Sequence, residues 1–546
     1  MSDEKTFHSK MNRRRVLQGL GGVGLAGIAG CSGQGGSGTG TGNGTEGGSS
    51  SKLKIGQTKS PIEFDPIVLN DVPSTEVVDR IVEGLYSYDE STGLVPVLAT
   101  GEPEVSKEGT RYVVEIEENA TFSNGDTVTA EDVKYSFEAP VKEQTENASE
   151  LNMIDTIEAV DEKTVQFDLK YAFAPFPNTL AWYVVPKSVR EEDKDAFNTG
   201  GNLVGSGPFT FEEWSEGQFV RIKANPDYWG DPKPKLDEVE FVPVEESTTR
   251  VTTLKNGEND VIKGIPPKQY STIRNMGDVN INEVPSIGYY YAAFNCKEGP
   301  TTDPLVREGV DYAFSMDQAV SNYVEPTGVR QYSPYPKAVA EEWGFPIDEW
   351  KQIPHDKNVD KTKELFDEAG VPDDYSFKII VPPDDMREQI GISISNGLKE
   401  AGWEATVQRL DWGKFSEKYV TGKESDYNIY TLGWSGTPDP DAFTYYLFGA
   451  TDDTIGVTEG TYYHDSSDKG ATATEKFVQA RKENDQKKRK QLYVEGTTTV
   501  LEDRAHLPAY NLKNSFGVKD YVKDFASHPV LQFTLSTDHN NVSVQK

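Results

Sequence analysis

Cysteine is scarce in this sequence, which excludes a fold that depends on disulfide bonds. The 546 residues contain only two cysteines, Cys31 and Cys296. Cys31 falls in a segment with the features of a processing signal, so the folded part keeps no pair that could form a bridge. Cys296 is interpreted as a small buried apolar residue, because no activating histidine lies near it in the sequence. Stability must therefore come from core packing.

Histidine is also rare, and the common catalytic motifs are absent. The chain has six histidines and contains no HExxH, GxSxG, paired-cysteine or phosphate-loop pattern. We therefore predict a protein that is not an enzyme, with no cofactor and no metal site; an exported hydrolase is the disfavoured alternative. Binding of nickel or a nickel–histidine complex through His464 and His506 is the least supported ligand alternative.

Basic residues are too few to balance the acidic ones. The chain has 55 Lys and Arg against 89 Asp and Glu, a net charge of −34. This charge excludes nucleic acid and anionic membrane surfaces as partners, since phosphates would be repelled. The acidic residues are spread along the chain, which favours the surface of a protein from a salt-loving (halophilic) organism over simple solubility. The charge says nothing about the ligand.

Long apolar runs are missing except for a short one near the N-terminus. Residues 12–31 join a basic cluster to a Gly/Ala-rich apolar stretch that is too short for a stable membrane-spanning helix. Arg13 and Arg14 resemble a twin-arginine export (Tat) motif, with an ordinary secretory signal as the alternative. Ile28 to Cys31 resembles a lipobox, whose cysteine accepts a lipid. We therefore predict a lipoprotein signal over 1–31 and lipidation of Cys31.

A Gly/Ser/Thr tract over 32–51 follows this signal and is predicted to be a flexible linker. A lipid on Cys31 and a flexible linker would hold the folded part outside the cell, on the outer face of the cytoplasmic membrane. From Lys52 onward, runs such as 112–116 alternate at the period of a strand, and 386–398 carries apolar residues at helical spacing. The chain is therefore predicted to be α/β, with a β/α unit of its own over 300–440.

Three helix starts can be assigned from capping residues. Thr129 and Asp132, three positions apart, form a capping-box pattern. Asp303 stands directly before Pro304, which suits the first turn of a helix. Ser74 is predicted to cap a further helix whose apolar stripe follows it.

The segment 122–133, FSNGDTVTAEDV, closely resembles the signature of the dipeptide, oligopeptide and nickel-binding receptors of ABC importers. At this length the similarity is specific, although its physical content is a turn that feeds a capped helix. Further matches to the same family occur in the expected order, at Phe64-Asp65-Pro66, Glu83-Gly84-Leu85, 94–99, 205–209, 225–229, Phe294-Asn295, Val306-Arg307-Glu308 and Asp439-Pro440.

The resemblance implies a two-lobed periplasmic-binding-protein (clamshell) fold with an extra subdomain in the first lobe. The implied boundaries are 52–94, 205–295 and 505–546 for lobe I, 95–204 for the extra subdomain and 296–504 for lobe II.

The resemblance also implies transmembrane transport of a small solute, by default a peptide, that is delivered to ABC permease subunits with their ATPase. Contact with the membrane only through the lipid anchor and a monomeric state are further expectations. The alternatives are a sensor or scaffold lipoprotein on the same fold, and a receptor for oligosaccharides or nickel chelates.

A Gly/Pro-rich loop over 433–440 follows a predicted strand, and such loops often carry binding sites. The resemblance places a ligand-contacting tryptophan at Trp434. Peptide-binding members carry an aspartate three residues later, which neutralises the α-amino group of the ligand, whereas this chain has Thr437. Asp439 or Asp441 could substitute for it after a shift of the loop, although an aspartate before proline, such as Asp439, more often caps a turn.

The resemblance identifies 287–295 as a strand that crosses between the lobes. Alternation would place Tyr289 and Tyr291 on one face and Tyr290 on the other, so at least one phenol is expected to reach the ligand. Asn295 is expected either to bind the ligand backbone with its amide or to hold the hinge.

Overall fold

The computed structural model describes residues 51–449, 460–535 and 541–546. The predicted export signal, with Arg13, Arg14 and Cys31, lies outside the described residues. Within those ranges no helix is long and apolar enough to cross a membrane.

A large mixed sheet organises the described chain. Within the described ranges it has twelve strands, in the order β16-β15-β17-β13-β18-β11-β1-β10-β9-β8, with β12 and β14 also paired to β18. Strands β15, β16 and β17 run parallel, as do β1, β10 and β11, while β13 and β18 run antiparallel to their neighbours. A separate four-stranded sheet has the order β4-β5-β7-β6.

The bounds of the strands are as follows: β1 Lys52–Gln57, β2 Tyr86–Tyr88, β3 Leu94–Pro96, β4 Glu104–Ser106, β5 Arg111–Glu115, β6 Ile154–Ala159, β7 Thr164–Leu169, β8 Phe209–Ser215, β9 Phe219–Ala224, β10 Glu238–Pro243, β11 Val261–Lys263, β12 Val279–Pro285, β13 Gly288–Phe294, β14 Gly328–Arg330, β15 Ser376–Val381, β16 Glu404–Arg409, β17 Ile429–Ser435, β18 His506–Lys519, β19 Val522–Lys523 and β20 Ser543–Val544.

The helices have these bounds: α1 Val72–Val78, α2 Ala130–Glu143, α3 Phe176–Thr179, α4 Lys187–Glu192, α5 Lys194–Asn198, α6 Ser247–Asn256, α7 Tyr270–Arg274, α8 Pro304–Ala313, α9 Met316–Tyr323, α10 Lys337–Glu342, α11 Ile347–Trp350, α12 Val359–Glu368, α13 Asp385–Ala401, α14 Trp412–Tyr419, α15 Asp441–Phe448, α16 Asp468–Ala480 and α17 Gln486–Glu502. Short 3₁₀ turns lie between them, including η2 Glu146–Leu151.

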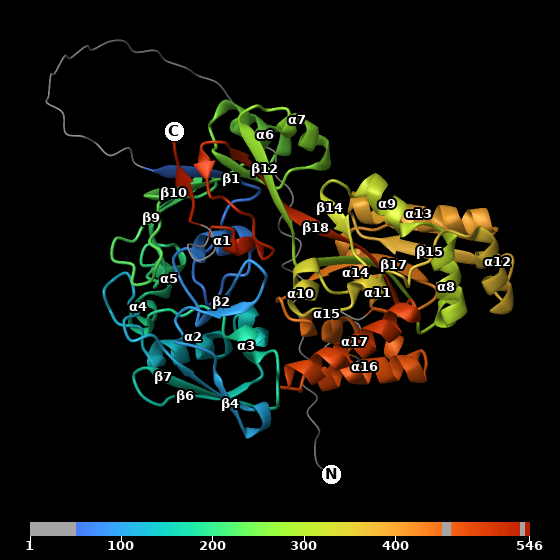
Figure 1. The fold of residues 1–546 in the computed structure, drawn as a ribbon, viewed down its shortest axis with the longest axis horizontal. Helices are drawn as coiled ribbons and strands as arrows, with labels where there is room; N and C mark the ends of the chain where they lie inside the picture. The colour runs from blue at the N-terminus through green and yellow to red at the C-terminus, as the bar shows by residue number, and fades with distance from the viewer. Residues whose placement is uncertain (1–50, 450–459, 536–540) are drawn as a thin grey trace. The chain divides into compact units, whose positions relative to one another are not determined.

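Strand β18 belongs to both halves of the large sheet (Figure 1). Its first part pairs with β13, where Ala293 lies opposite His506, and its last part pairs with β11 and β12, where Val279 lies opposite Lys519. We call the half around β13 and β15–β17 the second lobe, and the half around β1 and β8–β12, with the four-stranded sheet, the first lobe. The two lobes therefore share a strand.

The buried apolar residues form separate cores. The largest core runs from Tyr289 to Tyr510 and fills the second lobe. A second core includes Leu53, Phe241 and Val518, and a third packs the four-stranded sheet against α2. A small fourth core surrounds α6 and α7.

Two of the three predicted helix starts are confirmed, and one is wrong. Thr129 and Asp132 form a capping box at the start of α2, and Asp303 caps α8 with Pro304 in its first turn. At α1 the cap is Asp71, whose side chain accepts from the Ser74 N–H. The Ser74 hydroxyl instead accepts a hydrogen bond from the Ile62 backbone at 2.9 Å, so a distant segment takes the group that would cap the helix.

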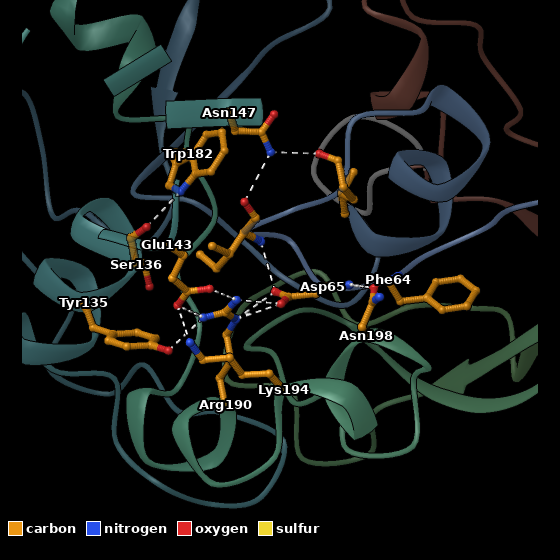
Figure 2. A network of polar contacts seen from close by, with 12 residues as sticks. Phe64, Asp65, Tyr135, Ser136, Glu143, Asn147, Trp182, Arg190, Lys194 and Asn198 are labelled. Atoms are coloured by element: carbon orange, nitrogen blue, oxygen red, sulfur yellow. Dashed lines mark hydrogen bonds and ion pairs between the residues drawn. The ribbon is translucent and has the colours of Figure 1, made fainter. Parts of the chain in front are cut away.

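A buried arginine joins three segments of the first lobe (Figure 2). The Arg190 guanidinium on α4 pairs with Asp65 at 2.7 Å and donates to Glu143 and to the Tyr135 hydroxyl at 2.8 Å each. The side chains of Arg190 and Asp65 are 1% and 3% exposed. Although burial opposes it, the hydrogen bonds from Arg190 and Lys194 lower the pKa of Glu143. This network fixes the extended segment after β1 against α2 and α4.

Candidate functional site

The loop predicted from its glycines and prolines lies at the carboxyl end of β17. Residues 429–432 of this strand are buried, residues 433–437 are half-buried or exposed, and residues 438–440 are buried again. A β-carbon on Gly433 would lie 2.5 Å from the Tyr290 ring on β13, so this glycine lets the ring cover the strand. The carboxyl ends of parallel strands are where α/β proteins usually mount binding sites.

Trp434 forms an aromatic wall with Tyr445 and Tyr446, the two tyrosines of α15. The half-buried Trp434 ring lies 5.9 Å from that of Tyr446, with 30° between their planes. The Trp434 indole N–H donates to the Ala442 carbonyl at 2.6 Å. The indole is therefore held in place, and one edge of the wall stays accessible, since Tyr446 is also half-buried.

Asp439 is neutralised by a buried arginine of α17. Its two carboxylate oxygens accept hydrogen bonds from Arg489 at 2.6 and 2.9 Å, and the side chains are 3% and 7% exposed. Asp439 also accepts from the Asp441 N–H at 2.8 Å, which is the turn-capping role that an aspartate before proline commonly plays.

Asp441, the second aspartate of the loop, faces a different arginine. Arg481 at the end of α16 approaches it to 3.4 Å and lies 3.6 Å above the Tyr445 ring. Burial, together with the negative charge of Asp439, raises the pKa of Asp441 to about 7, against the attraction of Arg481. At neutral pH this carboxyl group is therefore partly protonated.

The raised pKa of Asp441 predicts a loss of stability with rising pH. The folded pKa of about 7 exceeds the usual 3.8, so the folded state binds the extra proton between these values. Relative to Asp441→Asn, the wild type should lose about 2–3 kcal/mol of unfolding free energy from pH 5 to pH 8. Urea unfolding of both proteins at the two pH values measures this difference; parallel pH dependences would contradict the shift.

Thr437 is exposed and brings no charge to the loop. Both nearby aspartates have arginine partners, Asp439 with Arg489 and Asp441 with Arg481. No carboxylate of this loop is thus left without a cationic neighbour in the described structure.

The three consecutive tyrosines of β13 point to two faces, as alternation requires. Tyr290 stacks on Tyr510 of β18, with ring centres 4.7 Å apart and 5° between the planes. The Arg387 guanidinium at the start of α13 lies 5.8 Å from the Tyr290 ring. Because Tyr290 is half-buried and lies opposite Gly433, it adjoins the strand that carries Trp434.

Tyr289 and Tyr291 lie on the other face and are buried. Their rings stack 4.7 Å apart, and Tyr291 stacks on His506 at 4.1 Å. Burial lowers the pKa of His506, which keeps this imidazole neutral. His506 is therefore a packed core residue, and within the described ranges no group of three or more possible metal ligands is found.

Asn295 lies at the opposite end of the β13–β17 pair from Trp434. Its amide nitrogen donates to the Tyr427 carbonyl at 3.2 Å, and its oxygen accepts from the N–H groups of Lys297 and Glu298. Residue 294 pairs with Ile429 whereas Tyr289 pairs with Trp434, which separates the two ends by five residues, roughly 17 Å. The structure does not bring Asn295 together with the loop.

The first lobe reaches this loop directly. The Asn178 amide donates to Asp439 at 3.2 Å, and the Tyr88 hydroxyl donates to Asn178 at 3.0 Å. The Ala174 N–H also donates to the Arg481 carbonyl at 2.8 Å. The segment around α3 therefore contacts both the loop after β17 and the end of α16.

A hollow of about 270 Å³ lies between the two lobes at α10. Lobe I contributes Glu90, Ser91, Val284, Pro285 and Pro529, and α10 contributes Lys337, Ala338, Glu341 and Glu342. Lys337 approaches Glu341 to 3.7 Å, so a cation of the chain already offsets part of this negative charge.

Sequence reasoning missed Arg481, Arg489, Arg387 and Asn178. Arg489 lies 50 residues from Asp439, so no local pattern links them. Tyr445 and Tyr446 could have been identified from the sequence, because two consecutive tyrosines follow the loop within one or two helical turns.

Comparison with known proteins shows which protein family the sequence matches. Residues 93–454 match the family described as "Bacterial extracellular solute-binding proteins, family 5 Middle". The oligopeptide-binding protein AppA of Bacillus subtilis is 24% identical over 501 residues, which cover 87% of this chain and 89% of that protein. The glutathione-binding protein GsiB of Escherichia coli O157:H7 is 28% identical over 390 residues, 68% of this chain and 73% of GsiB.

Solved structures match the fold over most of the chain. HbpA2 from Haemophilus parasuis superposes with a TM-score of 0.78 at 22% identity, covering 91% of this chain and all of that one. AppA from Bacillus subtilis in complex with a nonapeptide gives a TM-score of 0.68 at 22% identity, covering 91% and 99%. The predicted α/β fold of a two-lobed periplasmic binding protein, with a subdomain added to the first lobe, is confirmed.

Proposed function

The chain belongs to the bacterial extracellular solute-binding proteins of family 5, and from this premise we propose that it captures peptides for an ABC importer and delivers them to the permease. The observation that carries this proposal is the match of residues 93–454 to a family of receptors. The role is binding and not catalysis. Its partners are the solute and the permease subunits with their ATPase, and the receptor acts as a monomer.

The site supports an organic solute with apolar and polar groups. The half-buried surface of Trp434 and Tyr446 offers contact to side chains, while the stacked Tyr290 presents a phenol near the same strand ends. Aromatic walls of this kind are common in small-molecule sites. Among the curated relatives, AppA is named for oligopeptides and GsiB for glutathione, which is itself a peptide. We propose that Trp434, Thr437 and Tyr290 contact the solute.

We further propose that a lipid on Cys31 anchors the receptor to the outer face of the membrane after export through the Arg13-Arg14 signal. The support is the sequence of residues 12–31 and the Gly/Ser/Thr tract that follows. Replacement of Cys31 by serine should release the protein from the membrane fraction of its host into the medium; retention in the membrane would contradict the anchor.

A thermal-shift screen tests the peptide function. The fragment from Ser50 onward forms one compact unit and suits the assay. It is screened against peptides of two to eight residues, oligosaccharides, and nickel with histidine. A peptide at about a hundred times its dissociation constant should add roughly 2.7 kcal/mol to the unfolding free energy. Stabilisation only by sugars or by the nickel complex would overturn the peptide assignment.

The same screen at low and molar salt tests the halophilic origin that we propose for the acidic surface. With a net charge of −34, self-repulsion destabilises the folded state until salt screens it. The melting temperature without ligand should therefore rise as salt increases from about 0.1 M to about 2 M. A melting temperature that does not change with salt would contradict this origin.

A further inference from the structure

The backbone passes between the two lobes at two places within the described ranges, the link from β12 to β13 and the middle of β18. Away from these crossings, the lobes touch only through groups that can separate. Movement about a few crossing residues is a common way for two lobes to close on a solute. The contacts between the lobes away from the crossings therefore show which surfaces meet when the protein closes.

The residues packed on the four-stranded sheet make one group of such contacts, with the end of α16. The Ala174 N–H donates to the Arg481 carbonyl at 2.8 Å, and the Phe173 ring lies 4.8 Å from the Arg481 guanidinium. The same guanidinium lies 3.6 Å from the ring of Tyr445 in the aromatic wall. One arginine thus contacts an aromatic ring of each lobe, in the geometry that attracts a cation to a ring face.

A second group of contacts joins the turn between β4 and β5 to the turn between α16 and α17. The first turn contains the 3₁₀ turn η1, Lys107–Gly109, and the second carries Asn484. The Tyr112 hydroxyl donates to the side-chain oxygen of Asn484 at 3.4 Å, and the Asn484 amide donates to the Glu108 carbonyl at 3.5 Å. Both hydrogen bonds are long and therefore weak, which suits a contact that has to open.

Gly109 allows this close approach because it has no side chain. Its φ of +83° is a conformation that residues other than glycine disfavour. A β-carbon at this position would also lie 1.9 Å from the amide nitrogen of Asn484 and 2.7 Å from its Cγ, far inside van der Waals contact. Gly125 in the same lobe has a φ of +88°, yet a β-carbon on it would meet nothing within 4 Å. The approach to the second lobe is therefore specific to Gly109.

We propose that Gly109 and Asn484 form the contact on which the second lobe comes to rest when the receptor closes on its solute. They are positioning residues, which act through Arg481 on the Tyr445 ring and the Asp441 carboxyl group of the candidate site. This proposal rests on the proposed function, since closure serves the capture of a solute. It assigns the surface that the second lobe meets to the four-stranded sheet and the residues packed on it.

A disulfide bond between positions 109 and 484 tests the proposal. The 2.7 Å between a β-carbon at 109 and Asn484 Cγ suits such a bond, whose two β-carbons lie roughly 3.5–4.5 Å apart. The fragment from Ser50 onward carries Gly109→Cys with Asn484→Cys or, as the control, Gly125→Cys with Asn484→Cys. The control has a cysteine at an equally positive φ, so the backbone strain is matched. The native Cys296 is buried and should not react.

The two measurements are the rate of cross-linking in a glutathione redox buffer and the radius of gyration from small-angle scattering. The 109–484 pair should cross-link at least ~10-fold faster than the control pair, because only its sulfur atoms meet when the lobes close. A pool of synthetic peptides of two to eight residues should raise this rate further, since a bound solute favours the closed form. Oxidation should lower the radius of gyration of the ligand-free protein, and reduction should restore it.

The possible outcomes separate this proposal from the function on which it rests. If the 109–484 pair reacts no faster than the control, the contact does not form and the proposal falls. If the pair reacts fast but the oxidised and reduced proteins have the same radius of gyration, the contact is permanent packing, and the proposal falls even where peptides bind. If oxidation compacts the protein but no peptide changes the rate, the contact on closure stands and the peptide function fails.

Discussion

Replacement of Arg190 by methionine should lower the free energy of unfolding by about 3–5 kcal/mol. Methionine keeps much of the volume of the side chain but removes the charge that Asp65 and Glu143 share. Asp65 is 3% exposed as a side chain, so its carboxylate would stay buried without a cationic partner. Urea unfolding at fixed salt and pH measures the loss.

The control for this variant lies on the same helix. Lys187 is the first residue of α4, and it pairs with Glu131 at 3.6 Å with both side chains largely exposed. Lys187→Met should change the unfolding free energy by less than about 1 kcal/mol, the range of exposed ion pairs. If the two variants lose equal unfolding free energy, the buried network of Figure 2 does not stabilise the protein more than an exposed ion pair does.

Replacement of Arg489 by methionine should be similarly costly, about 3–5 kcal/mol, and should also weaken ligand binding. Asp439 would lose its two charged hydrogen bonds and would remain buried without a cationic partner. Because Asp439 accepts a hydrogen bond from the N–H of Asp441, the first residue of the helix that carries Tyr446, the aromatic wall would lose part of its support. Unfolding in urea and titration with a peptide ligand measure the two effects separately.

Two further variants sharpen this prediction. Lys487→Met lies on the same helix at an exposed position and should leave stability and affinity nearly unchanged. The double variant Asp439→Asn with Arg489→Met should recover part of the lost stability, because no buried charge is then left unpaired. A double variant that loses as much as both single changes added together would show that the pair acts through packing instead.

The sequence allowed good predictions where the physics is local. A capping box needs only two residues three positions apart, so Thr129 and Asp132 identified the start of α2 correctly. Asp303 before Pro304 did the same for α8. The prediction at Ser74 failed because its hydroxyl accepts from Ile62, twelve residues earlier, while Asp71 caps the helix. Local patterns do not reveal which of two candidate caps will bond to another segment of the chain instead.

The candidate site was predictable in its position but not in its charges. Glycines and prolines marked the loop that carries Trp434, and a family resemblance pointed to the same place. The arginines that neutralise Asp439 and Asp441 come from helices 50 and 40 residues later in the chain. Sequence spacing does not show which arginine pairs with which aspartate, because α16 and α17 reach the loop only once the chain has folded.

The strand shared by both lobes sets a limit on when the protein can fold during its synthesis. Strand β18 spans His506–Lys519, near the end of the chain, and lies between β13 and β11 in the middle of the large sheet. While the ribosome is still making earlier residues, both halves of the sheet lack their common neighbour, and each exposes an open edge to pairing with other chains. The fold can close only after residue 519 has left the ribosome, so a truncated product that stops before β18 should aggregate instead of yielding one finished lobe.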